Sequence, residues 1–122
     1  MSPIALPAAV LAFVRATNSG DLPAIIAAFA DDALVNDQLL EYWGKAEISA
    51  WAARDIVKVR LTIRVLRSHK HYEQYVVRAQ FEGDFDRRGL PDPLTLTLYC
   101  AVRGEQIVQL IILRDQSGAY PF

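Results

Sequence analysis

The hydrophobic period of the chain changes near residue 57, and no other feature of the sequence constrains the fold as strongly. Residues 7–56 place apolar side chains three and four positions apart, which is the spacing of amphipathic helices. Residues 57–114 instead alternate apolar and polar side chains, as half-buried strands do. Helices followed by strands are typical of α+β proteins. The 122 residues fit one domain over positions 1–122.

The first half predicts three helices and one short strand. The first helix is expected over Pro7–Asn18, because proline suits the first helical turn. Asp21 is the expected N-cap of a short second helix. Asp31-Asp32 is expected to break the chain before a brief strand over residues 33–35. A third helix is expected near residues 45–55.

The second half predicts a meander of four long strands, over residues 57–65, 74–84, 94–103 and 106–114. Gly104-Glu105 is typical of a tight hairpin between the last two strands. The last strand is apolar on both faces, which favours a position in the middle of the sheet. Helices can cover one face. We expect a second copy of the chain to cover the other, as a homodimer through the outer sheet face.

Composition excludes several classes of protein. Thirteen Lys and Arg stand against fourteen Asp and Glu, so a nucleic-acid partner is not expected. The apolar runs are shorter than a membrane span, so a membrane partner is not expected either. The first residues lack the basic segment of a signal peptide, and a cytoplasmic protein is expected.

No cofactor or metal ion is expected. The sequence contains no glycine-rich phosphate loop. His69 and His71 lie two positions apart without further ligands in a cluster, which favours surface turn residues over a metal site. Cys100 has apolar neighbours, which favours a buried, inert thiol over a nucleophile.

Two stretches of the chain resemble a known family. Residues 20–37, GDLPAIIAAFADDALVND, are similar to the first part of the nuclear transport factor 2-like (NTF2-like) superfamily, closest to its SnoaL-like polyketide cyclase and ketosteroid isomerase branches. Residues 42–51, YWGKAEISAW, resemble the start of that family's third helix. The resemblance covers nearly the whole chain. It implies a cone-like fold, with three N-terminal helices packed on a curved, mainly antiparallel sheet around a pocket.

The resemblance also implies a role for Asp37, since the matching carboxylate of ketosteroid isomerase-like proteins is the base that moves a proton. An apolar pocket raises the pKa of a carboxylate, which suits this role. The alternative is that Asp37 caps a turn. The resemblance places Phe13 and Thr97 where the isomerases hold the enolate oxygen with Tyr and a protonated Asp, so their full route is not expected. A water-activating site like that of the epoxide hydrolase branch would combine Asp37 with Arg114 and Asp115.

Other side chains are expected to line the pocket and contact the substrate, and they come from all parts of the chain: Phe13, Tyr42, Trp43, Trp51, Thr97, Tyr99, Leu110, Ile112 and Arg114. Arg114 is either at the pocket rim or a solvated strand end, and Tyr99 points inward or onto the dimer face. Three functions stay open. The first is a cofactor-free isomerase, cyclase or hydrolase that acts on a small apolar substrate with Asp37 as base. The others are a non-catalytic binding module for an apolar ligand and a structural or interaction domain.

Overall fold

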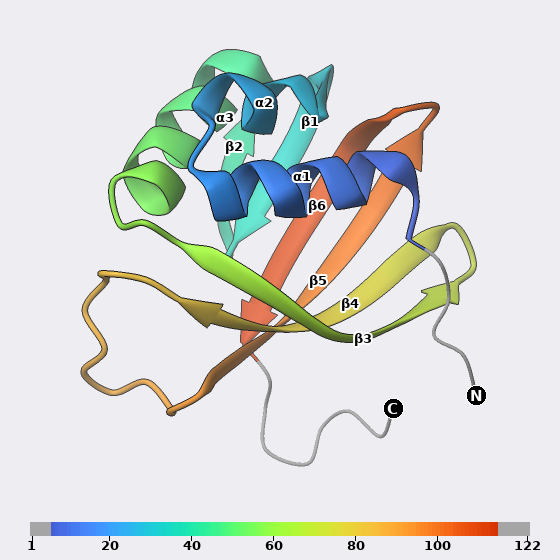
Figure 1. Ribbon diagram of the computed structural model, residues 1–122. Helices are drawn as coiled ribbons and strands as arrows, with labels where there is room; N and C mark the ends of the chain where they lie inside the picture. The colour runs from blue at the N-terminus through green and yellow to red at the C-terminus, as the bar shows by residue number, and fades with distance from the viewer. Residues whose placement is uncertain (1–5, 115–122) are drawn as a thin grey trace.

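Six strands form one bent sheet in the computed structural model, which describes residues 6–114, and the helices lie against one side of that sheet (Figure 1). We call the side covered by the helices the inner face and the opposite side the outer face. In chain order the elements are α1 (Ala8–Ser19), α2 (Leu22–Ala27), β1 (Phe29–Asp37), β2 (Leu40–Trp43), α3 (Gly44–Ala52), the π-helical turn η1 (Ala53–Val57), β3 (Thr62–His71), β4 (Gln74–Glu82), β5 (Leu94–Arg103) and β6 (Gln106–Arg114).

The strand order is β2-β1-β6-β5-β4-β3, and every neighbouring pair is antiparallel except β1 and β6. The sheet is therefore mixed, although it is mainly antiparallel. Strands β3 to β6 form the predicted meander. The position of β6 between β1 and β5 confirms that its two apolar faces belong to a central strand.

The caps of the first two helices explain their boundaries. Pro7 precedes α1, and Gly20 ends it in the left-handed conformation with φ of +67°, which glycine adopts without steric cost. The Asp21 carboxylate accepts a hydrogen bond of 3.2 Å from the Ala24 backbone N–H and so caps α2. Among the described helices, none has the length and apolar character needed to cross a membrane.

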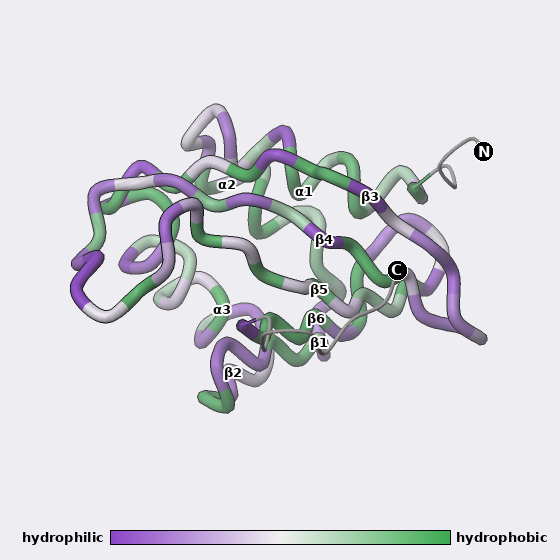
Figure 2. Tube along the Cα trace, turned by 90° about the horizontal axis from the view of Figure 1, so that it is seen from below, coloured by the Kyte–Doolittle hydropathy of each residue, from purple (hydrophilic) through white to green (hydrophobic). Residues whose placement is uncertain are grey.

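Aromatic rings join the helices to β1. Phe13 of α1 contacts Phe29 edge to face with ring centres 5.5 Å apart, and Phe29 contacts Trp51 of α3 in the same way at 6.5 Å. All three side chains are almost fully buried. Figure 2 shows hydrophobic residues along α1, β5 and β6, whereas the segment between β4 and β5 is largely hydrophilic at its tip.

The predicted strand over residues 57–65 begins five residues late, and this prediction is wrong at its start. The chain continues α3 as the π-helical turn η1, and the Leu61 N–H then donates to the Ile56 carbonyl at 2.9 Å. The sequence pattern did identify side chains that share one side, because Val59, Leu61 and Ile63 all line the same cavity. Only Ile63 does so from a strand.

The predicted break at Asp31-Asp32 lies inside a nine-residue strand, β1. Both aspartates are exposed because the register of β1 shifts between Phe29 and Leu34, as a bulge does. Asp32 there forms an ion pair with Arg103 at 3.1 Å. The short edge strand β2 was not predicted.

Candidate functional site

A cavity of about 270 Å³ opens between the helices and the inner face of the sheet. Most of its wall is hydrophobic. Polar character comes from two carboxylates, one amide and one guanidinium among the described residues. The lining residues are Phe13, Asp37, Gln38, Trp51, Asp55, Ile56, Val59, Leu61, Ile63, Phe81, Phe85, Leu90, Leu94, Leu96, Ile112 and Arg114.

Part of the cavity wall is made by two connections that bind each other, the turn after η1 and the segment after β4. The Asp84 N–H donates to the Val59 carbonyl at 2.6 Å. A Cβ atom at Gly83 would lie only 2.9 Å from that carbonyl oxygen, so only glycine allows this approach. The contact positions Val59 beside Phe85 and Leu90 at the cavity.

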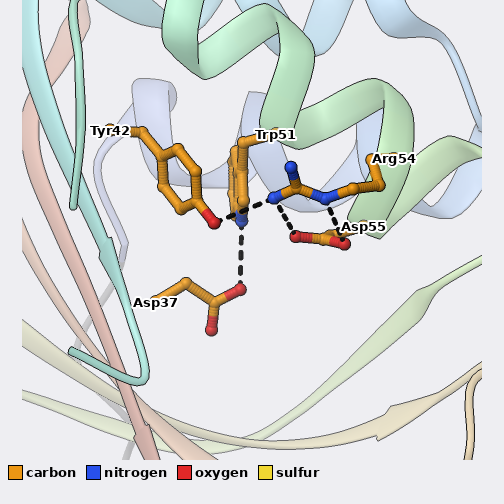
Figure 3. A network of polar contacts seen from close by, with 5 residues as sticks. All are labelled: Asp37, Tyr42, Trp51, Arg54 and Asp55. Carbon is orange, nitrogen blue, oxygen red and sulfur yellow. Dashed lines mark hydrogen bonds and ion pairs between the residues drawn. The ribbon is translucent and has the colours of Figure 1, made fainter. Parts of the chain in front are cut away.

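Asp37 ends β1 and presents its carboxylate to the cavity. The indole Nε1 of Trp51 donates a hydrogen bond of 3.0 Å to the Asp37 Oδ2 atom, which fixes the orientation of the carboxylate (Figure 3). Burial raises the pKa of Asp37 above its usual 3.8, and the negative charge of Asp55 adds to this effect. Hydrogen bonds from Trp51 and Gln38 and the charge of Arg54 oppose the rise without cancelling it.

A second polar group lies beside this carboxylate. Arg54 donates from Nε and Nη2 to the two oxygens of Asp55, at 3.0 and 2.7 Å. Its Nη2 atom also donates to the Tyr42 hydroxyl at 2.8 Å (Figure 3). Asp55 was not predicted as a site residue. One signal was present, because Asp55 follows Trp51 by four positions and residues four apart share a helix face.

Comparison with known proteins agrees with this geometry. The family model for the SnoaL-like domain matches residues 10–110. The chain belongs to the SnoaL-like domain family. Its structure has the NTF2-like fold that the sequence resemblance implied. Among curated protein sequences, none is significantly similar to this SnoaL-like chain.

Solved structures with this fold are numerous. A candidate polyketide cyclase from Sinorhizobium meliloti is 28% identical, with a TM-score of 0.78 over 88% of this chain and 95% of that one. A hypothetical protein with a ketosteroid isomerase-like fold from Catenulispora acidiphila, solved with trimethylamine, is 21% identical, with a TM-score of 0.75 over 93% of this chain and 89% of that one. A Mycobacterium tuberculosis protein solved with estradiol-17β-hemisuccinate is 15% identical, with a TM-score of 0.73 over 89% and 92%.

The structure brings together five of the ten predicted site residues of this SnoaL-like domain. These five line the cavity: Phe13, Asp37, Trp51, Ile112 and Arg114. Tyr42 lies behind Trp51, with ring centres 6.2 Å apart, and Leu110 is fully buried in the core beside Ile112. Both belong to the surroundings of the cavity rather than to its wall.

The other three predicted residues do not line the cavity. Thr97 and Tyr99 alternate with the inward-facing Leu96 and Leu98 of β5 and therefore lie on the outer face of the sheet. Trp43 is 57% exposed. The resemblance suggested Thr97, and the sequence left the direction of Tyr99 open. A shift of one position along a strand reverses the face on which a side chain lies.

Two further predictions concern reactive side chains. Burial raises the pKa of the Cys100 thiol to about 12, which makes it the inert core thiol that was expected. Within residues 6–114, no group of three His, Cys, Asp or Glu side chains is arranged to hold a metal ion. Asp115 lies outside the described residues, so the site that would combine it with Asp37 and Arg114 stays a prediction.

Proposed function

We propose that this SnoaL-like domain is a cofactor-free acid–base enzyme, an isomerase, cyclase or hydrolase that moves a proton on a small apolar substrate with Asp37 as the base. The observation that carries the proposal is the position of Asp37, a half-buried carboxylate on the wall of an apolar cavity. Its raised pKa makes it a better proton acceptor once ionised, and Trp51 fixes its direction.

The chemistry follows from this arrangement. The substrate ring packs against Phe13 and Trp51, with an acidic C–H bond directed at Asp37. The Asp37 carboxylate takes the proton, and the electron pair of the broken C–H bond moves into the neighbouring carbonyl group. In an isomerisation, Asp37 returns the proton to another carbon. In a cyclisation, the electron pair forms a carbon–carbon bond to a second carbonyl carbon of the same substrate, the π bond of that carbonyl breaks, and its oxygen takes the proton back from Asp37. General-base catalysis of this kind contributes about 10²- to 10⁴-fold.

The similar structures support the binding half of the proposal. One is described as a candidate polyketide cyclase, and another was solved with a steroid ester. Both descriptions fit a cavity whose wall is almost wholly aliphatic and aromatic. Pockets of this composition hold ring compounds and use a few polar groups to orient them.

The test compares Asp37→Asn with the parent protein. Each protein is incubated in D₂O with small enolisable ring ketones, and NMR follows the exchange of their acidic protons. Asn keeps the shape and can still accept the Trp51 hydrogen bond, but it cannot take a proton. We expect exchange to fall by about 100-fold or more. Asp84→Asn, which changes an exposed carboxylate paired with Arg60, should leave exchange intact. Equal exchange in Asp37→Asn and the parent would show that Asp37 is not the base.

A non-catalytic binding module is the second candidate. This candidate is favoured by Phe13, which lines the cavity at the position where the resemblance implies a Tyr that binds the enolate. A phenylalanine side chain cannot donate a hydrogen bond to an enolate oxygen. Ligand binding without proton exchange in either protein would support this candidate. The absence of any ligand would instead favour a structural or interaction domain.

We also propose a homodimer through the outer sheet face and a cytoplasmic location. Half-buried apolar side chains cluster there on neighbouring strands, since Ile111 pairs with Tyr99 and Leu113 follows on the same side of β6. Light scattering of the parent protein should give twice the monomer mass of 13.6 kDa. The Ile111→Glu protein should give the monomer mass. A parent protein that stays at 13.6 kDa at micromolar concentration would contradict the dimer.

A further inference from the structure

We propose that Arg114 anchors an acidic oxygen of the ligand, so that the cavity takes compounds in which an apolar ring carries a carboxylate or a similar anionic oxygen. The inference rests on the proposed function of this cavity and names its substrate class. Three observations carry it: the place of Arg114 in the sheet, the pairing of the other charges at the cavity, and the apolar wall around them.

The sheet register places Arg114 close to Asp37. Asp37 lies opposite Ile112 in the parallel pair of β1 and β6, and Arg114 follows two residues later on the same face. Two residues advance a strand by about 7 Å, and neighbouring strands are about 4.8 Å apart. The Cα atoms of Asp37 and Arg114 are therefore about 8 Å apart by this geometry. Both side chains line the cavity, so one small ligand can contact the two.

Three other arginines at this end of the molecule already have carboxylate partners. Arg54 holds both oxygens of Asp55, Arg60 pairs with Asp84, and Arg88 pairs with Asp86. Arg114 forms no ion pair with any side chain of residues 6–114, Asp37 included. Among the described lining residues it is the one cation, and it remains available to a ligand.

The chemistry of these groups favours an anion over a cation. A guanidinium presents a planar pair of donors that matches a carboxylate. A cationic ligand would need a free carboxylate, but Asp55 is neutralised by Arg54, and a cation held by Asp37 would lie close to the positive charge of Arg114. Leu96 is the direct neighbour of Arg114 on β5 and lines the cavity with it, so an apolar ring can pack beside the bound acidic group.

The test uses a matched pair of bicyclic probes, 2-naphthoate and 2-naphthamide, which differ in charge but hardly in shape. Isothermal titration calorimetry at pH 7 and low salt should show that the parent protein binds 2-naphthoate about tenfold more tightly than 2-naphthamide. Arg114→Met keeps the apolar stem of the side chain and should remove this preference, with 2-naphthamide affinity unchanged within about twofold. Arg15→Met, on the exposed side of α1, is the control for loss of one positive charge and should keep the preference.

Other outcomes would overturn the inference. Equal affinity of the parent protein for both probes, or an intact preference in Arg114→Met, would show that Arg114 is not the anchor. Tighter binding of 2-naphthylmethylamine than of 2-naphthoate would show that the site selects cations. Asp37→Asn separates this inference from the proposed function. It should lose proton exchange yet bind 2-naphthoate at least as tightly as the parent, because it removes a like charge from the site.

Discussion

Asp37 is the residue whose protonation links the proposed chemistry to the stability of this protein. Burial raises its pKa above 3.8 and outweighs the hydrogen bonds of Trp51 and Gln38. A group in this state is better accommodated by the fold when it is protonated than when it is charged. The same feature that makes Asp37 a suitable base therefore costs stability at neutral pH.

Asp37→Asn should increase the free energy of unfolding at pH 7 by about 1 kcal/mol, in the range of stabilising changes at functional sites. Folded Asp37 has a higher pKa than unfolded Asp37, so the folded protein binds its proton more tightly. This tighter proton binding stabilises the folded state fully below pH 3.8, and the stabilisation is lost as the pH rises through the raised pKa of Asp37. Asn does not ionise and loses nothing over that range.

Urea unfolding at several values between pH 4 and pH 7 measures this effect. The difference between Asp37→Asn and the parent protein should be smallest at pH 4 and should grow as the pH rises. A difference that is the same at every pH would contradict the assignment of a raised pKa to Asp37, because it would point to packing rather than ionisation.

At the scale of helices and strands, the elements with local signals were predictable. Asp21 caps its helix as expected, the alternation of β4 and β5 is plain in the sequence, and the apolar run of β6 is typical of a central strand. The edge strand β2 was missed because its hairpin turns at Gln38 and Leu39, which have φ of +55° and +73° without a glycine between them. The turn η1 was missed because residues 53–57 show no local signal for a π-helical turn.

The contact between the segment after β4 and the turn after η1 gives a prediction for Gly83. Gly83→Ala would place a Cβ atom 2.9 Å from the Val59 carbonyl oxygen, so the backbone must move. We expect a loss of about 1–3 kcal/mol in the free energy of unfolding, as for other overpacked sites. Thermal unfolding measures it.

Gly89→Ala is the matched control in the same connection. Its Cβ would meet nothing within 4 Å, although the φ of +76° adds a strain of about 1 kcal/mol. A Gly83→Ala protein that is more stable than Gly89→Ala would show that the approach to Val59 is not tight.

At the scale of the whole molecule, the cavity is a space that the core leaves open. Leu96 and Leu98 lie two residues apart on the same face of β5, but Leu96 lines the cavity and Leu98 is packed in the core with 1% exposure. Leu96→Phe should extend a ring into the cavity at little cost in stability and weaken 2-naphthoate binding at least about tenfold. Leu98→Phe should lower the free energy of unfolding by about 1–3 kcal/mol.

Calorimetry and chemical unfolding of the two variants check this contrast. If Leu96→Phe is destabilised as much as Leu98→Phe, the space beside Leu96 is filled in solution. If it binds 2-naphthoate as the parent does, the ligand occupies another place.

The candidate site was predictable where family resemblance and local pattern agree. Phe13 and Trp51 belong to this group, since they lie on helices that the sequence predicts. Asp37 was identified from the resemblance, because the strand predicted over residues 33–35 is shorter than β1 and ends before Asp37. Phe85 and Leu90 do not belong to this group, because they reach the cavity from a connection whose path depends on long-range contacts such as that of Gly83 with Val59. The sequence identifies the wall made by helices and strands, and the structure adds the wall made by connections.

The central place of β6 affects how the protein can be made. The strand is the last described element in the chain, yet it separates β1 from β5 in the sheet. During synthesis, β1 and β2 are not joined to the rest of the sheet, and β5 keeps an unpaired edge, until residues 106–114 have left the ribosome. Neither the sheet nor the cavity, which needs Ile112, exists before then. Closure of the complete sheet is therefore the last step that the order of synthesis allows.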